Sequence, residues 1–224
     1  MSKLLLVPTP VGNLRDFTFR AVEVLNSADL ILAEDTRQAK KLLNHYGITT
    51  PLQSHHKFNE HKTVDSDCSK IQAGVKIAVI SNAGTPGISD PGFLLVRACI
   101  EKGIEIETLP GPTSLIPALI NSGLPSDRFC FEGFLPVKKG RNKRLSGLRE
   151  EQRTMIFFES PFRLVRTLDD MAGVFGAERA ASVSRELSKI YEENMRGTIA
   201  SLAAHYREKP PRGEIVLVVS GKES

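Results

Sequence analysis

The chain has 224 residues, of which 41% are hydrophobic and 25% charged, and it carries a formal net charge of +4. This composition is typical of a soluble globular protein with one domain or two small ones. It excludes a membrane-spanning protein, because no apolar run approaches the roughly 18 residues of a span. The N-terminal apolar run ends at Pro8, so we expect a cytoplasmic protein without a signal peptide or anchor. Three widely spaced cysteines without C-x-x-C and five histidines without metal spacing predict neither a disulfide framework nor a metal site.

Strands and helices alternate over the first half of the chain. Asp16 is a plausible N-cap for the first helix, and Gly47 and Gly103 follow two others. The alternation predicts a mostly parallel sheet with helices on both faces. The expected strands are 3–8, 29–35, 76–81 and 104–109, and the expected helices are 17–27, 36–46, 60–73 and 93–102.

A second alternating series follows the sequence PGP at 110–112. Ser160 and Pro161 are typical of a helix start, as N-cap and first helical residue. We expect strands at 128–135, 154–159, 180–187 and 214–220, and helices at 113–123, after 160 and at 198–206. The prediction is therefore an α/β chain of two domains, residues 1–112 and 113–224, with parallel or mixed sheets.

Four loops at strand ends are rich in glycine and proline: the first loop (PTPVGN, 8–13), the second (SNAGTPGISDPG, 81–92), the third (LPGPTS, 109–114) and the fourth (PRGE, 211–214). Ligands of open parallel sheets bind beyond the carboxyl ends of the strands, and glycine lets the backbone approach them closely. A turn explains any one of these loops, but four together favour a binding site. The chain has neither G-x-G nor a P-loop, so the loops alone do not identify the ligand.

A basic segment follows the first strand of the second half. No acidic residue occurs between Gly133 and Arg149. This pattern suits either a solvated connector or a surface that binds phosphates. Its basic residues are Lys138, Lys139, Arg141, Lys143, Arg144 and Arg149.

Taken in order, the motifs resemble the small-subunit ribosomal RNA cytidine-2′-O-methyltransferases of the RsmI type, within the tetrapyrrole methylase superfamily. The resemblance runs from about residue 4 to 219 and is carried by LLLVPTPVGNLRDFTFRAVEVL, DLILAEDTR, SNAGTPGISDPG, LPGPTSLIPAL, LPSDRFCFEGFLP, FFESPFR, SREL and RGEIVLVV. AEDTR, the second loop and LPSDRF are specific to this branch, whereas PGP and the final strand are features of the whole superfamily. One departure is Asn82, where the family usually has Asp.

This resemblance implies two α/β domains with S-adenosylmethionine in the cleft between them, and a homodimer. The implied reaction is methylation of the ribose 2′-hydroxyl of a cytidine in small-subunit ribosomal RNA. Matched by motif, the implied cofactor contacts are Pro10, Ala83, Gly84, Thr85, Ile88, Thr113, Ser114, Phe158, Gly213 and Glu214. Together with this substrate class, the charge pattern of the basic segment predicts RNA contacts at Lys138, Lys139, Arg141, Lys143 and Arg144.

Methyl transfer from a sulfonium requires mainly that the attacking oxygen be positioned, although a base that accepts its proton helps. His56, Glu60 and Glu159 are the foremost catalytic candidates, and the other candidates are Asn59, Glu34, Asp35 and Arg37. Structural roles remain open, because Asp35 is also a plausible helix cap and Glu159 a plausible partner of Arg163.

Two other functions stay open. One is methylation of a tetrapyrrole ring carbon, and the other is a binding module for RNA or nucleotide without catalysis. The scarcity of aromatic residues, 6% with no tryptophan, argues against base stacking as the basis of such a module. The sequence does not identify the modified nucleotide, the need for an assembled subunit or the dimer interface.

Overall fold

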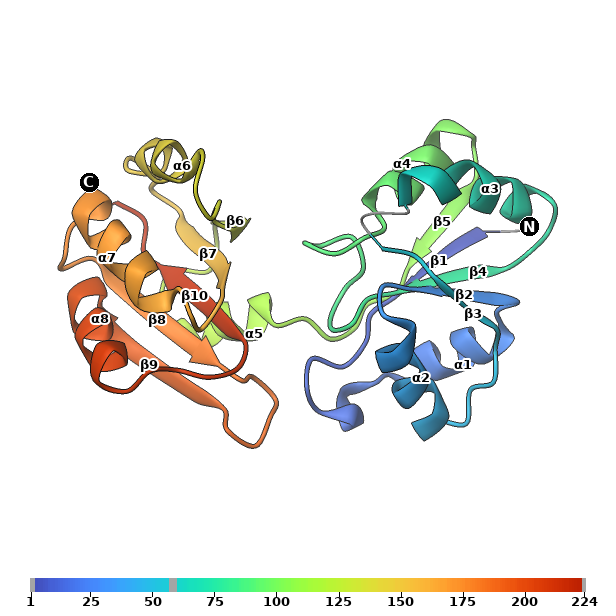
Figure 1. The fold of residues 1–224 in the computed structure, drawn as a ribbon, viewed down its shortest axis with the longest axis horizontal. Helices are drawn as coiled ribbons and strands as arrows, with labels where there is room; N and C mark the ends of the chain where they lie inside the picture. Colours follow the sequence, from blue (N-terminus) through green and yellow to red (C-terminus); the bar gives the residue numbers. More distant parts are fainter. Residues whose placement is uncertain (1–2, 57–59, 223–224) are drawn as a thin grey trace. The chain divides into compact units, whose positions relative to one another are not determined.

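The computed structural model describes residues 3–56 and 60–222, and the chain divides into two compact units, 1–113 and 114–224 (Figure 1). Each unit contains one five-stranded sheet. Every strand and helix expected from the sequence is present, most of them shortened by one or two residues at an end. Among the described residues, no helix combines the length and the apolar character needed to cross a membrane.

The first unit has a wholly parallel sheet with the strand order β3-β2-β4-β1-β5. Its central strands are buried on both faces, as expected of parallel strands covered by helices. The predicted mostly parallel sheet is thus confirmed in this unit. The strands are β1 (Lys3–Val7), β2 (Leu30–Ala33), β3 (Leu52–Ser54), β4 (Ile77–Ile80) and β5 (Glu105–Thr108).

Alternate residues of these strands enter two separate cores. Leu5 and Val7 of β1 pack with helices α1 (Phe19–Ser27) and α2 (Thr36–His45). Leu4 and Leu6 pack on the other face with α3 (Glu60–Gln72) and α4 (Phe93–Glu101). The period of two along the strand thus places a pair of helices on each face.

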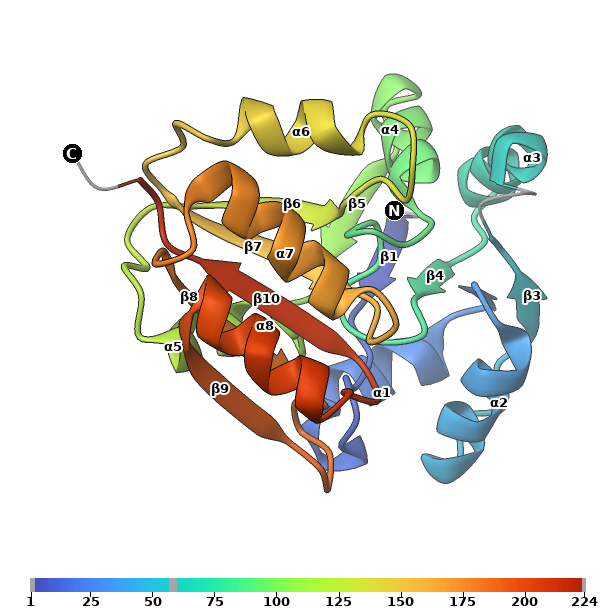
Figure 2. The same cartoon turned by 60° about the vertical axis from the view of Figure 1, so that its left-hand side comes forward.

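The second unit has a mixed sheet with the order β6-β7-β10-β8-β9, in which only β6 and β7 run parallel. Helices α6, α7 and α8 cover one face and α5 covers the other, and Figure 2 shows α7 and α8 in front of the sheet with α5 behind. The strands are β6 (Phe129–Phe134), β7 (Thr154–Glu159), β8 (Ala180–Arg185), β9 (Glu193–Thr198) and β10 (Ile215–Val219), and the helices are α5 (Leu115–Ser122), α6 (Arg141–Gly147), α7 (Leu164–Phe175) and α8 (Ile199–Glu208).

Two expected helix starts are wrong. Residues Leu14–Asp16 form a short 3₁₀ turn, and α1 is capped by Thr18, whose Oγ1 accepts a hydrogen bond from the Ala21 amide at 3.0 Å. Likewise α7 begins at Leu164, because the amide of Ser160 donates to the Glu159 side chain and the next residues form a turn closed by Arg163. In each case a local turn occupies the residues expected to start the helix.

Candidate functional site

The first and second loops are joined by hydrogen bonds in the first unit. Thr9 and Gly84 exchange a pair of backbone hydrogen bonds of 2.9 and 2.8 Å. The Thr9 hydroxyl donates to the Ser81 carbonyl at 3.0 Å, and the Ser81 hydroxyl donates to the Gly84 carbonyl at 2.9 Å. Gly84 has a φ of +79°, which a residue with a side chain rarely adopts. Glycine therefore allows the second loop to turn back against the first.

The third loop packs against both of these. A Cβ added at Gly111 would lie 2.9 Å from the Pro8 side chain, so only glycine fits there. A Cβ added at Gly84 would lie 3.8 Å from the Pro112 carbonyl oxygen and 4.0 Å from the Thr113 Cα. The structure thus brings three loops together beyond the carboxyl ends of β1, β4 and β5, where parallel sheets bind ligands.

Several expected cofactor residues lie within this cluster of loops. Pro10 and Gly84 are buried, Ala83, Thr85 and Thr113 are half-buried, and Ile88 is exposed. Apart from Ile88, these residues have small side chains, so a ligand that contacts them would also lie close to the backbone of the loops.

In the AEDTR motif at the end of β2, Asp35 and Glu34 make different contacts. Asp35 caps α2, because its Oδ1 accepts a hydrogen bond from the Arg37 amide at 2.8 Å. A hydrogen bond from the Arg37 side chain lowers the pKa of the Asp35 carboxyl. Glu34 instead accepts a 3.0 Å hydrogen bond from the Asn82 side chain of the second loop. The capping role of Asp35 is confirmed, and Glu34 is placed beside the second loop.

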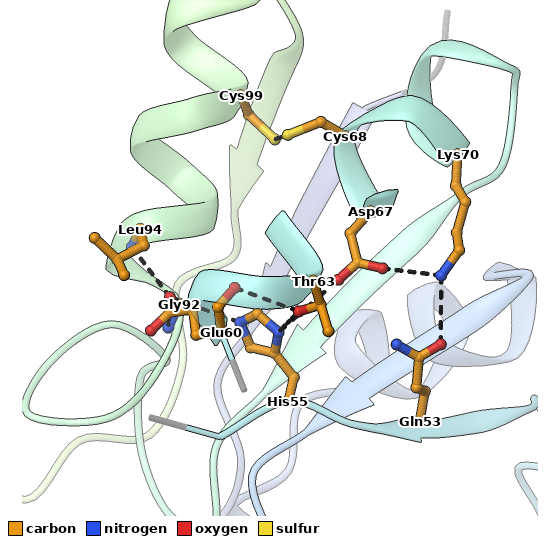
Figure 3. A network of polar contacts seen from close by, with 10 residues as sticks. All are labelled: Gln53, His55, Glu60, Thr63, Asp67, Cys68, Lys70, Gly92, Leu94 and Cys99. Atoms are coloured by element: carbon orange, nitrogen blue, oxygen red, sulfur yellow. Dashed lines mark hydrogen bonds and ion pairs between the residues drawn. The ribbon is translucent and has the colours of Figure 1, made fainter. Parts of the chain in front are cut away.

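Glu60, expected as a catalytic residue, is the first residue of α3 and is buried in a polar network (Figure 3). Its Oε1 accepts hydrogen bonds from the backbone amides of Gly92 and Leu94 at 3.0 and 3.1 Å. This carboxylate oxygen is therefore engaged with the start of α4. His56 is half-buried after β3, and Asn59 lies outside the described residues.

The sequence did not single out His55, which is 1% exposed and lies between two carboxylates. Its Nε2 is 3.6 Å from Glu60 Oε1 and its Nδ1 is 4.0 Å from Asp67 Oδ2. Burial lowers the pKa of His55, and the two carboxylates partly oppose this effect. No motif indicated this residue, because its environment is created only when α3 packs beside β3.

In the second unit, two segments of expected cofactor residues lie at one end of the sheet. β7 and β10 are antiparallel with Phe158 opposite Val216 and Glu159 opposite Ile215. Gly213 and Glu214, which precede β10, therefore lie beside the end of β7. Phe158 is half-buried against Phe131 and Phe134, with ring centroids 4.9 and 5.6 Å away. Ser114 is the N-cap residue of α5, without a side-chain capping hydrogen bond.

Gly213 lies against the side chain of Glu186, which the sequence did not predict as a site residue. A Cβ at Gly213 would lie 2.3 Å from Glu186 Cδ, and Gly213 has a φ of +87°. Glu186 accepts hydrogen bonds from the Glu214 amide at 2.8 Å and from Lys189 at 2.9 Å. The fourth loop thus depends on glycine both for its backbone angle and for room.

Glu159, the third expected catalytic residue, has a side chain that is only 1% exposed. Its Oε1 accepts from the Ser160 amide at 2.7 Å and pairs with Arg163 at 2.8 Å. Its Oε2 accepts from the Thr167 hydroxyl at 2.5 Å. The alternative pairing with Arg163 is confirmed, and both oxygens are occupied within the unit.

The basic segment contains helix α6, and its basic side chains include some that are paired within the unit and some that are exposed without an ion pair. Arg141 is buried, donating from Nε to Asp170 at 2.7 Å and from Nη2 to Thr167 at 2.8 Å. Arg144 is exposed but forms an ion pair with Glu132. Within the described part of the chain, three further side chains of the segment are exposed and form no ion pair: Lys138, Lys139 and Lys143.

Curated relatives match nearly the whole chain. The chain is 51% identical over 99% of its length to a protein of Synechocystis sp. and 45% identical over 100% to one of Thermotoga maritima. It is also 50% identical over 98% of its length to a protein of Haemophilus influenzae. The matches cover 80%, 100% and 78% of these relatives, and each relative is named ribosomal RNA small subunit methyltransferase I.

Solved structures show the same fold at low identity. Cobalt precorrin-4 methyltransferase, a cobalamin biosynthetic enzyme, aligns with a TM-score of 0.72 and 16% identity, over 98% of this chain and 95% of that one. Uroporphyrin-III-C-methyltransferase from Thermus thermophilus aligns with a TM-score of 0.68 and 19% identity, over 98% and 94%. A family model described as tetrapyrrole (corrin/porphyrin) methylases matches residues 3–203. The chain therefore belongs to the tetrapyrrole methylase family.

Proposed function

We propose that this chain is an S-adenosylmethionine-dependent methyltransferase that modifies ribosomal RNA of the small subunit. The observation that carries the proposal is 51% identity over 99% of the chain to a protein with that named activity. The tetrapyrrole enzymes of the same fold are only 16–19% identical, so they support the fold and not a tetrapyrrole substrate.

The loop cluster of the first unit suits a cofactor of this kind. S-adenosylmethionine supplies an electrophilic methyl group, which needs a positioned acceptor oxygen. Gly84 and Gly111 hold the three loops in contact, which leaves the half-buried Ala83, Thr85 and Thr113 available to bind the cofactor. In the second unit, Ser114, Phe158, Gly213 and Glu214 remain the proposed cofactor contacts.

For the acceptor we propose the 2′-hydroxyl of a cytidine, on the strength of the RsmI-type motifs. The three exposed lysines of the basic segment are the proposed phosphate contacts, since unpaired cations on a surface bind a polyanion most readily. Arg141 and Arg144 are engaged within the unit, and we assign them to holding α6 in place.

Among the catalytic candidates, we retain His56 for substrate handling. Both oxygens of Glu159 are occupied by hydrogen bonds and an ion pair, which disfavours a role as proton acceptor. Glu60 is bound to backbone amides of the second loop and α4. The family resemblance also supports a homodimer, which sedimentation equilibrium of the purified chain would test.

The test is transfer of a radioactive methyl group from S-adenosylmethionine to isolated small subunits that lack the modification. Large subunits and a precorrin-like tetrapyrrole serve as competing acceptors, and naked small-subunit RNA tests whether assembly is required. We expect label only in small-subunit RNA, recovered after nuclease digestion as 2′-O-methylcytidine. Label in the tetrapyrrole alone, or cofactor binding without any transfer, would refute the proposal.

A further inference from the structure

The start of α4 lacks a capping side chain of its own. Its N-cap residue is Gly92, with a φ of +127° and no side chain that could accept a hydrogen bond. The first amides of a helix have no partner within the helix and need an acceptor from elsewhere. Glu60 supplies that acceptor from α3, through the bonds from Gly92 and Leu94 to its Oε1 (Figure 3). Its negative charge also interacts favourably with the helix N-terminus.

This contact fixes one end of the second loop. Near the other end, the paired backbone bonds between Thr9 and Gly84 hold the loop against the first loop. The proposed cofactor contacts Thr85 and Ile88 lie between these two anchors, and Ala83 lies beside the Thr9–Gly84 anchor. The loop is therefore held at both ends, by Glu60 at Gly92 and by Thr9 at Gly84.

Glu60 is itself held in position by burial. It is 5% exposed, and His55 approaches Oε1 through Nε2 at 3.6 Å. Thr63 Oγ1 lies 3.5 Å from Nδ1 of the same imidazole. Asp67, fully buried about two turns further along α3, accepts a hydrogen bond from Lys70 at 2.9 Å, and none of the hydrogen bonds of the described residues joins it to the second loop.

We propose that Glu60 is a positioning residue that holds the second loop in the conformation that binds S-adenosylmethionine. It acts through the amides of Gly92 and Leu94 and accepts no proton from the substrate. This inference rests on the proposed function, because the loop matters to activity only if it binds the cofactor.

The experiment compares three variants with the wild-type chain by calorimetric titration with S-adenosylmethionine and by methyl transfer at saturating cofactor. Glu60→Ala removes the acceptor, Glu60→Gln keeps a neutral acceptor, and Asp67→Asn changes an equally buried carboxylate of the same helix that does not contact the loop. We expect Kd to rise at least about tenfold in Glu60→Ala, because this variant loses both charge-assisted hydrogen bonds that hold the loop amides. The rise should be smaller in Glu60→Gln and less than about twofold in Asp67→Asn, because only Glu60 binds the loop amides.

The three possible roles of Glu60 give different results. A positioning role raises Kd and the KM for the cofactor and leaves kcat within a few-fold of wild type. A catalytic base lowers kcat with an unchanged Kd and shifts the pH-rate profile, and a merely structural role lowers stability with an unchanged Kd. Either of the last two results would overturn the inference.

Amide hydrogen exchange over residues 87–96 provides a second measurement that needs no activity. We expect faster exchange there in Glu60→Gln than in Asp67→Asn, and equal exchange in the two would also overturn the inference. If the wild-type chain itself bound no cofactor, the proposed function would fail together with the inference. Wild-type binding combined with unaffected Glu60 variants would overturn the inference alone.

Discussion

Gly213→Ala is expected to destabilise the second unit through two separate effects. The φ of +87° at Gly213 is in the left-handed region, where a side chain costs about 1–2 kcal/mol. The new Cβ would also lie 2.3 Å from both Cδ and Oε1 of Glu186, so this side chain must move.

Moving Glu186 removes the 2.8 Å hydrogen bond from the Glu214 amide and the 2.9 Å contact with Lys189. Hydrogen bonds to charged groups contribute about 1.5–3 kcal/mol, and partial exposure here reduces that contribution to about 1 kcal/mol. The expected loss in the free energy of unfolding is therefore about 2–3 kcal/mol. Because Gly213 and Glu214 are proposed cofactor contacts, affinity for S-adenosylmethionine should fall as well.

Gly140→Ala is the matched control, since Gly140 has the same φ of +87° and no atom within 4 Å of an added Cβ. It should show the conformational cost alone. Adding Glu186→Ala to Gly213→Ala removes the collision, so in that background the glycine substitution should also cost only the conformational part. Urea unfolding followed by circular dichroism measures each difference. If Gly213→Ala costs no more than Gly140→Ala, the proposed collision with Glu186 is refuted.

Three further predictions concern charge. Replacing the three exposed lysines of the basic segment by glutamate should weaken binding of small-subunit RNA at least about tenfold and flatten the salt dependence of that binding. Cofactor affinity and the same replacement at Lys40 and Lys41 of α2 serve as controls. An equal loss of RNA binding in the two lysine variants would contradict a specific RNA-binding surface on the basic segment. Burial lowers the pKa of His55 in the folded chain from 6.5, so on acidification this side chain is protonated in the unfolded chain before it is protonated in the folded chain. The contribution of His55 to the free energy of unfolding should therefore be complete above pH 6.5 and fall below it, by at most about 1.4 kcal/mol per pH unit. Thermal unfolding between pH 7.5 and 5 should show a shallower fall in His55→Gln, and identical slopes would contradict this origin. Asn82→Asp replaces the amide that donates to Glu34 by a carboxylate, so it should lower the free energy of unfolding at pH 8 by no more than about 1 kcal/mol and by clearly less at pH 4, where both carboxyl groups are partly protonated. An equal change at both pH values would exclude charge repulsion.

The apolar strands could be predicted from the sequence, including the edge strands β5 and β6, whereas the short strand β3, the polar strand β9 and the basic helix α6 were missed. Leu4–Val7 and Ile77–Ile80 are apolar on both faces, as central parallel strands require. The missed strand β9 has the polar sequence ENMRGT and is a strand because its backbone pairs with β8. The missed helix α6 has a strongly basic sequence, and it packs on the unit through Leu145 and the buried Arg141.

The loop cluster was predictable, but the environment of single side chains was not. Glycine and proline at strand ends indicated where the first three loops lie, because the carboxyl ends of parallel strands share one edge of a sheet. The sequence does not distinguish Arg141 from its neighbour Lys139, although the first is buried against Asp170 and the second is exposed. That difference depends on where the helix begins, because Arg141 is the first residue of α6 and bonds Asp170 of α7, whereas Lys139 lies in the turn before it.

Three carboxylates flank the proposed cofactor segments, and all three bind backbone amides. Glu60 accepts from Gly92 and Leu94, Glu159 from Ser160, and Glu186 from Glu214. In a sequence, an acidic residue beside a glycine-rich loop suggests acid–base catalysis as readily as a structural role. Methyl transfer from a sulfonium depends mainly on placing the acceptor oxygen in line with the methyl group. An enzyme of this kind gains more from rigid loops than from a strong base, and acidic residues that hold the loops rigid meet that requirement.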